Sequence, residues 1–219
     1  MRLLALNGSP RGPKSNTRFL TDEFQRGFVA TSSNQGETLD IARPSDRGKA
    51  LAAFWNSEAV LLGFPLYTDA MPGMVKEFLE QVATLPRPDR RPTLLFLVQS
   101  GFPEATHTAP VARYLERLAG RLGCAFAGVV RRGNIEGIRT QPAWMVRGIL
   151  GRFRGLGESF GRTGQLDPQE LHKLAGRERI PRFALRLVCW WSRLMFWDRE
   201  LKANHAYGKR FDTPYASGQ

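Results

Sequence analysis

The chain has 219 residues and a formal net charge of +12, from 32 Lys or Arg against 20 Asp or Glu. This length suits one domain, or one domain with an appendage, and allows a sizeable buried core. The basic excess favours anionic ligands or an acidic surface as partners, and because no nucleic-acid recognition module is visible, nucleic-acid binding is not expected.

The first predicted element is a β-strand over Arg2 to Leu6, followed by the stretch NGSPRGPKSNT at residues 7–17. Apolar residues at helical spacing predict a helix over Ser15 to Ala30, so the stretch is a strand-to-helix turn. Such turns bind anions because free N–H groups and the positive end of the helix dipole point into them. The side chains that add donors are Ser9, Ser15, Asn16 and Thr17.

Two known phosphate loops do not fit this turn. A P-loop would need a second glycine where Pro13 stands, and proline has no N–H to offer a phosphate. The third predicted strand also ends at Pro65, where a nucleotide hydrolase would use an aspartate. The dinucleotide fingerprint G-x-G-x-x-G is absent as well. The turn is therefore typical of a loop that holds a terminal monophosphate.

Apolar runs then alternate with helical segments, which predicts a parallel α/β sheet. The five expected strands are Arg2 to Leu6, Thr38 to Ala42, Ala59 to Phe64, Thr93 to Val98 and Ala125 to Val130. The expected helices are Ser15 to Ala30, Gly48 to Asn56, Pro72 to Ala83, Ala109 to Leu122 and Ala143 to Phe153, with two more in the tail. Ligands of open α/β sheets lie beyond the carboxyl ends of the strands, so the loops after strands one, three and four matter most.

The loops after strands three and four add a flat ring and a close backbone approach. Tyr67 offers an amphipathic ring, Gly101 lets a ligand approach the backbone, and Phe102 can cover it. Together with the first loop they predict a site for a phosphorylated planar ring. Tyr67 alone is also explained by packing on the sheet edge, and His107 and Asp69 by loop or capping roles. No catalytic side-chain constellation or metal cluster can be assembled, so a cofactor has to supply the chemistry.

The string NGSPRGPKSNT, followed by PLYTDAMPGMVKEFLE and then SGFPEA, resembles the flavodoxin-like NAD(P)H-dependent FMN reductase and quinone reductase family. The resemblance covers residues 1 to about 150, including RRGNIEGI after strand five. It implies a flavodoxin-like three-layer sandwich with strand order 2-1-3-4-5, bound FMN and pairing as a homodimer. The iron–sulfur cysteine cluster of some relatives is absent.

The same resemblance implies residue roles and a reaction. Ser9, Arg11, Ser15, Asn16 and Thr17 would hold the FMN phosphate, Pro65, Leu66, Tyr67 and Thr68 would line the isoalloxazine, and Ser100, Gly101 and Phe102 would close its other side. NAD(P)H would reduce bound FMN and leave before a quinone-like or other small organic acceptor binds, in a ping-pong cycle. The arginine surplus suits the 2′-phosphate of NADPH.

The last third is predicted to be a helical extension, residues 151–219, attached to an FMN-binding domain at residues 1–150. Over residues 180–202, Arg182, Arg186, Arg193 and Glu200 fall within about 40° on a helix that is otherwise apolar. The longest uncharged stretch, Leu187 to Ser192, is too short to span a membrane. Packing on the domain or across a dimer, contact with an anionic membrane surface, and a lid over the flavin all stay open.

Location and overall function complete the sequence-based expectations. The first residues predict a strand and not a signal peptide, so a cytoplasmic location is expected. Cys124 and Cys189 lie in unrelated apolar stretches and are expected to be buried thiols. The alternative to a flavin enzyme is a basic α/β scaffold, or a membrane-surface binding protein, that lacks flavin. The visible spectrum of the purified protein separates the two.

Overall fold

The computed structural model describes residues 1–31, 33–139 and 141–213. The chain divides into two compact units, Met1–Glu178 and Arg179–Gln219. The first unit extends beyond residue 150, where the sequence analysis placed a boundary, because one long helix runs from Ala143 to Thr163 and packs on the same sheet. We call the two parts unit 1 and unit 2.

Unit 1 is built on a five-stranded parallel sheet in the order β2-β1-β3-β4-β5, which confirms the predicted order. The strands are β1 (Arg2–Asn7), β2 (Gln35–Asp40), β3 (Ala59–Pro65), β4 (Thr93–Gln99) and β5 (Ala125–Arg132). The central strand β3 is buried along its whole length, as expected when helices cover both faces of a parallel sheet. Because all five strands run parallel, their carboxyl ends lie at one edge of the sheet.

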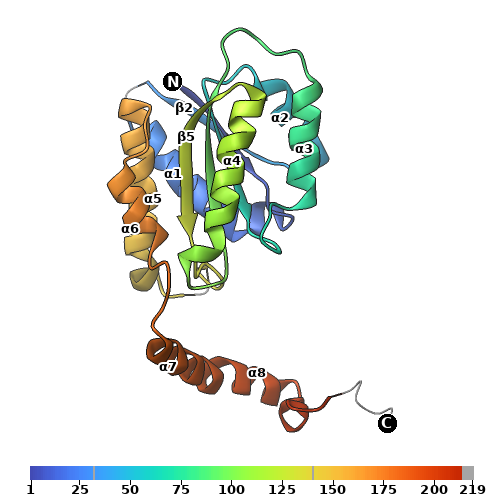
Figure 1. Ribbon diagram of the computed structural model, residues 1–219, viewed down its shortest axis with the longest axis vertical. Helices are drawn as coiled ribbons and strands as arrows, with labels where there is room; N and C mark the ends of the chain where they lie inside the picture. Colours follow the sequence, from blue (N-terminus) through green and yellow to red (C-terminus); the bar gives the residue numbers. More distant parts are fainter. Residues whose placement is uncertain (32, 140, 214–219) are drawn as a thin grey trace. The chain divides into compact units, whose positions relative to one another are not determined.

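Helices cover both faces of this sheet, and three layers result (Figure 1). The helices are α1 (Asn16–Val29), α2 (Pro44–Phe54), α3 (Gly73–Thr84), α4 (Ala109–Leu122), α5 (Ala143–Thr163) and α6 (Pro168–Ala175). In β1, Leu4 and Leu6 join a core with α2, α3 and α4, whereas Leu3 and Ala5 join a second core with α1, α5 and α6. This alternation follows from the two-residue period of a strand.

Three elements differ from the sequence-based expectation by three or more residues at one end. The edge strand β2 begins at Gln35 and ends at Asp40, because ladder pairing with β1 holds residues too polar to signal a strand. Helix α2 begins at Pro44, a residue suited to a first helical turn. Helix α5 continues past Phe153 to Thr163 despite its glycines, because packing against α1 outweighs their low helix propensity.

The contact between α1 and α5 depends on glycine. A Cβ atom on Gly157 would lie 1.9 Å from the carbonyl oxygen of Phe24, and one on Gly27 would lie 1.9 Å from that of Arg154. No side chain fits at either point, so the two helix backbones touch directly. Beside this crossing, the buried carboxylate of Glu23 accepts from Arg154 Nη2 at 2.7 Å and also pairs with Arg26.

Unit 2 is helical throughout its regular part, and its main helix is interrupted. Helix α7 (Arg182–Ser192) continues into a π-helical turn (Arg193–Trp197) and then into α8 (Asp198–Ala203). A 3₁₀ turn, η4 (Tyr207–Lys209), follows α8 along the chain. A π turn inserts about one extra residue, which rotates α8 by about 100° relative to an unbroken helix. Glu200 is therefore displaced from the predicted stripe, which reduces to Arg182, Arg186 and Arg193.

The two cysteines lie in different environments. Cys124 is buried, as expected, with its Sγ 3.9 Å from the Leu122 carbonyl oxygen, and burial raises the pKa of its thiol to about 11. Cys189 is exposed on α7, so the expectation that it is buried is wrong. The sequence around Cys189 is apolar, but none of the described residues of unit 2 belongs to a hydrophobic core that could cover it.

Candidate functional site

The loop after β1 is organised by Asn7, the fully buried last residue of that strand. Its Nδ2 donates to Asp40 Oδ1 at 2.7 Å and to the Gly12 carbonyl at 2.8 Å. Its Oδ1 accepts from the Ser9 amide at 3.2 Å and from Ser15 Oγ at 3.3 Å. One side chain thus holds both ends of the loop, and its own polar atoms are satisfied.

The loop leads into the N-terminus of α1, where two backbone donors are unpaired. Ser15 is the N-cap, and its hydroxyl accepts from the Arg18 amide at 3.0 Å. Within the described residues, the amide N–H groups of Asn16 and Thr17 have no hydrogen-bond partner. Free N–H groups at the positive end of a helix dipole favour an anion. The local chemistry therefore fits a phosphate.

The loop after β3 closes in a tight turn. Tyr67 and Ala70 pair through two backbone hydrogen bonds, Tyr67 N to Ala70 O at 2.9 Å and the reverse at 3.0 Å. The two residues between them, Thr68 and Asp69, have φ of 46° and 63°, which a β-branched threonine rarely adopts. The turn leaves the Tyr67 ring exposed at the carboxyl edge of the sheet.

The loops after β4 and β5 hold one another. The Ile135 amide donates to the Ser100 carbonyl at 3.0 Å, and the Asn134 amide donates to the Phe102 carbonyl at 2.8 Å. The loop after β5 also reaches the first loop, since Asn16 Nδ2 donates to the Ile135 carbonyl at 3.1 Å. The loops after β1, β4 and β5 are therefore tied together at one edge of the sheet.

These loops enclose a small polar cavity of about 80 Å³. It is lined by Ser9, Arg11, Asn16, Pro65, Leu66, Tyr67, Gln99, Ser100, Gly101 and Glu136. A volume of 80 Å³ corresponds to only a few water molecules, each of which takes about 30 Å³ in the liquid. A larger ligand anchored here has to extend along the open rim, beside the exposed Tyr67 ring.

Four residues of the predicted site do not line this cavity. Ser15 and Thr17 are buried, where Ser15 caps α1 and the Thr17 hydroxyl accepts from Gln99 Nε2 at 3.3 Å. Thr68 lies in the exposed turn. Phe102 stacks on His107, with ring centroids 4.5 Å apart.

Sequence reasoning missed three contributors to the site, Asn7, Gln99 and Glu136. Asn7 and Gln99 end strands β1 and β4, and a polar residue that closes an apolar strand is a signal that points to the carboxyl edge. Glu136 comes from the loop after β5 and pairs with Arg11 at 3.5 Å across the rim, with both side chains exposed. No local pattern marks that contact.

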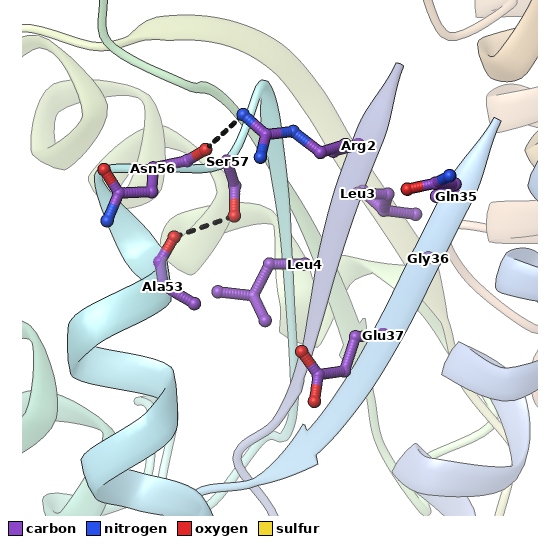
Figure 2. Close-up of a pocket in the computed structure, with 9 residues that line it drawn as sticks. All are labelled: Arg2, Leu3, Leu4, Gln35, Gly36, Glu37, Ala53, Asn56 and Ser57. Carbon is purple, nitrogen blue, oxygen red and sulfur yellow. Dashed lines mark hydrogen bonds between the residues drawn. The ribbon is translucent and has the colours of Figure 1, made fainter.

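A cavity of about 310 Å³ lies at the opposite, amino end of β1 and β2 (Figure 2). Two of its polar side chains are already engaged: Arg2 Nη2 donates to the Asn56 carbonyl at 3.1 Å, and Ser57 Oγ donates to the Ala53 carbonyl at 2.8 Å. No aromatic residue lines it. Because α/β sheets bind ligands at the carboxyl ends of their strands, we place the candidate site at the smaller cavity.

Comparison with protein families agrees with this geometry. The profile of a family described as having a flavodoxin-like fold matches residues 1–141. No curated protein matches the chain significantly.

Solved structures with the same architecture extend the comparison. The apo form of an NADH:FMN oxidoreductase aligns with a TM-score of 0.59 and 18% identity, over 84% of this chain and 98% of that one. An NAD(P)H:quinone oxidoreductase from Methanothermobacter marburgensis aligns with a TM-score of 0.57 and 17% identity, over 73% and 96%. An FMN-dependent NADH-azoreductase from Bacillus anthracis, in complex with FMN, aligns with a TM-score of 0.55 and 12% identity, over 73% and 99%. At these identities the likeness concerns the fold.

Proposed function

The chain belongs to the flavodoxin-like fold family, and on that premise we propose that it is an NAD(P)H-dependent oxidoreductase that binds FMN at the carboxyl ends of β1, β3 and β4. Its electron acceptor is a quinone-like or other small organic molecule. The observation that carries the proposal is the convergence of these loops on one polar cavity beside the free N–H groups of Asn16 and Thr17. The homodimer stays a prediction.

The residues present suit the cofactor. The amides of Asn16 and Thr17 would hold the phosphate, with Ser9 and Arg11 beside them at the cavity. Ser15 and Thr17 would position α1 and would not contact the phosphate through their hydroxyls, which are buried. The Ser15 hydroxyl ties the helix to Asn7 at the start of the loop, and the Thr17 hydroxyl ties it to Gln99 of β4. Pro65, Leu66, Tyr67, Ser100 and Gly101 would flank the ring from the neighbouring loops.

Bound FMN would supply the redox chemistry, accepting a hydride from the nicotinamide and returning electrons to the acceptor. The chain's own contribution is binding, orientation and charge. Arg11 adds positive charge at the rim, and its contact with Glu136 is an exposed pair that contributes little to stability. Arg11 is therefore available to an anionic ligand.

The phosphate role of α1 is tested at Asn16, the first residue of the helix. Asn16→Pro removes the backbone N–H at a position where helices tolerate proline, and the extended backbone of Ser15 (ψ 155°) suits a residue that precedes proline. Hydrogen bonds to charged groups contribute about 2 kcal/mol, so we expect FMN to bind about 30-fold more weakly. FMN fluorescence titrated with apoprotein measures the change.

Asn16→Ala is the matched control, because it removes the same side chain and its bond to Ile135 but keeps the N–H. We expect it to weaken FMN binding by only a few-fold. Equal affinities of the two variants would contradict the phosphate role of this amide. Purified wild-type protein that is colourless and does not take up added FMN would contradict the proposed function altogether.

The order of the reaction is a separate prediction. If NAD(P)H and the acceptor use one site in turn, double-reciprocal plots at several fixed acceptor concentrations should be parallel. The measurement is steady-state oxidation of NADH and of NADPH with a soluble quinone. Intersecting lines would contradict the ping-pong cycle while leaving FMN binding intact.

A further inference from the structure

Unit 2 carries a dense set of apolar side chains that it does not bury. Helix α7 and the π turn have no buried residue. The large apolar residues that are exposed there are Phe183, Leu185, Leu187, Val188, Trp190, Trp191, Leu194, Met195, Phe196 and Trp197. Apolar patches of this kind mark interaction sites, because soluble domains rarely leave them uncovered.

The charged side chains of unit 2 are arranged beside this surface. Arg182, Arg186 and Arg193 lie within about 40° on the helix, and Phe183, Leu187 and Trp191 occupy the broad remaining face. Among the described residues, no ion pair involves Arg182 or Arg186. Residues 179–219 contain eight Lys or Arg against three Asp or Glu, so the segment is strongly basic.

We propose that unit 2 is an amphipathic anchor whose α7 and π turn lie in the surface of an anionic lipid bilayer. A helix with Trp, Phe and Leu on one face and arginines on the other has the composition of interfacial helices. Tryptophan suits the headgroup level because its ring is apolar and its N–H is polar. None of the helices in the described residues is long and apolar enough to cross a bilayer.

Charge favours lipid over a protein surface of this same chain. Residues 1–178 contain 24 Lys or Arg against 17 Asp or Glu, so unit 1 is also basic. The same holds for unit 1 of a second copy of the chain. A groove of about 900 Å³ beside α1 and α5 is lined by Arg139, Arg147 and Arg154. The acidic residue in that groove, Glu23, is buried and paired with Arg154. A basic helix is poorly matched to this groove and well matched to anionic headgroups.

The test is co-sedimentation of the full chain with vesicles of phosphatidylcholine containing about 30% phosphatidylglycerol, a composition chosen for its negative surface potential. We expect binding at low salt, much weaker binding at high salt, and little binding to pure phosphatidylcholine. Replacing Arg182 and Arg186 together by glutamine should lower the partition coefficient about 30-fold, since each cation near the surface contributes about 1 kcal/mol. Replacing Trp190 and Trp191 together by alanine should lower it at least about tenfold.

The matched control is Trp144→Ala, which removes a 77% exposed tryptophan from unit 1 and should leave lipid binding unchanged. The thermal midpoint of each variant establishes that unit 1 is folded. Wild-type protein that stays in the supernatant with anionic vesicles at low salt would overturn the proposal. So would a lipid-free dimer that the Trp190 and Trp191 variant abolishes, because it would place a second copy on this surface. FMN binding does not enter either outcome.

Discussion

Replacing Gly157 by alanine is expected to lower the free energy of unfolding by about 3 kcal/mol, which is the upper end of the usual cost of adding a side-chain atom to a closely packed contact. The added Cβ would lie 1.9 Å from the carbonyl oxygen of Phe24 and 2.9 Å from the amide nitrogen of Phe28. Backbone atoms cannot rotate away, so α1 and α5 have to separate. For a unit of this size the loss corresponds to a thermal midpoint about 10 °C lower. Differential scanning calorimetry measures it.

Gly155 provides the control in the same helix. A Cβ on Gly155 meets no atom within 4 Å, so Gly155→Ala should be stabilising by about 0.5–1 kcal/mol through helix propensity alone. The two variants thus make the same chemical change with opposite expected signs. If both raised the midpoint, the direct contact between α1 and α5 would be wrong.

Replacing Asn7 by aspartate is the second variant with a large expected effect. The change keeps the size of the side chain, but it replaces the amide nitrogen, 2.7 Å from Asp40 Oδ1 and 2.8 Å from the Gly12 carbonyl, by an oxygen. Asn7 and Asp40 are 0% and 1% exposed, so water cannot screen the repulsion. We expect the free energy of unfolding to fall by about 4 kcal/mol at pH 8, and FMN affinity to fall with it.

The pH dependence identifies repulsion as the cause. Two carboxylates that share a buried site favour retention of one proton, so the folded variant binds more protons than its unfolded chain. Its deficit relative to wild type should therefore shrink as the pH falls from 8 to 5, in urea unfolding experiments. Asn7→Ala removes the same bonds without adding charge, and its deficit should stay constant. A constant deficit for Asn7→Asp would contradict the repulsion.

The candidate site was predictable from sequence where each loop carries its own chemistry. Ser9, Tyr67 and Gly101 each come two residues after an apolar strand, Asn16 begins the helix after the first of them, and parallel strands bring their carboxyl ends to one edge. The role of each side chain within its loop could not be predicted from the sequence as well. The hydroxyl of Ser15 looks like a ligand donor in the sequence, but in the fold it caps α1 and bonds to Asn7.

The sequence by itself determined the alternation of strands and helices, the phosphate-type turn and the mixture of arginine and tryptophan in the tail, because these depend on neighbours along the chain. Only the tertiary structure decided the length of α5, the role of Asn7 as the centre of the loop, and the contact of Gly157 with Phe24. Those features join residues from distant segments. Their free energy comes from packing and buried hydrogen bonds that exist only once the sheet and its helices have assembled.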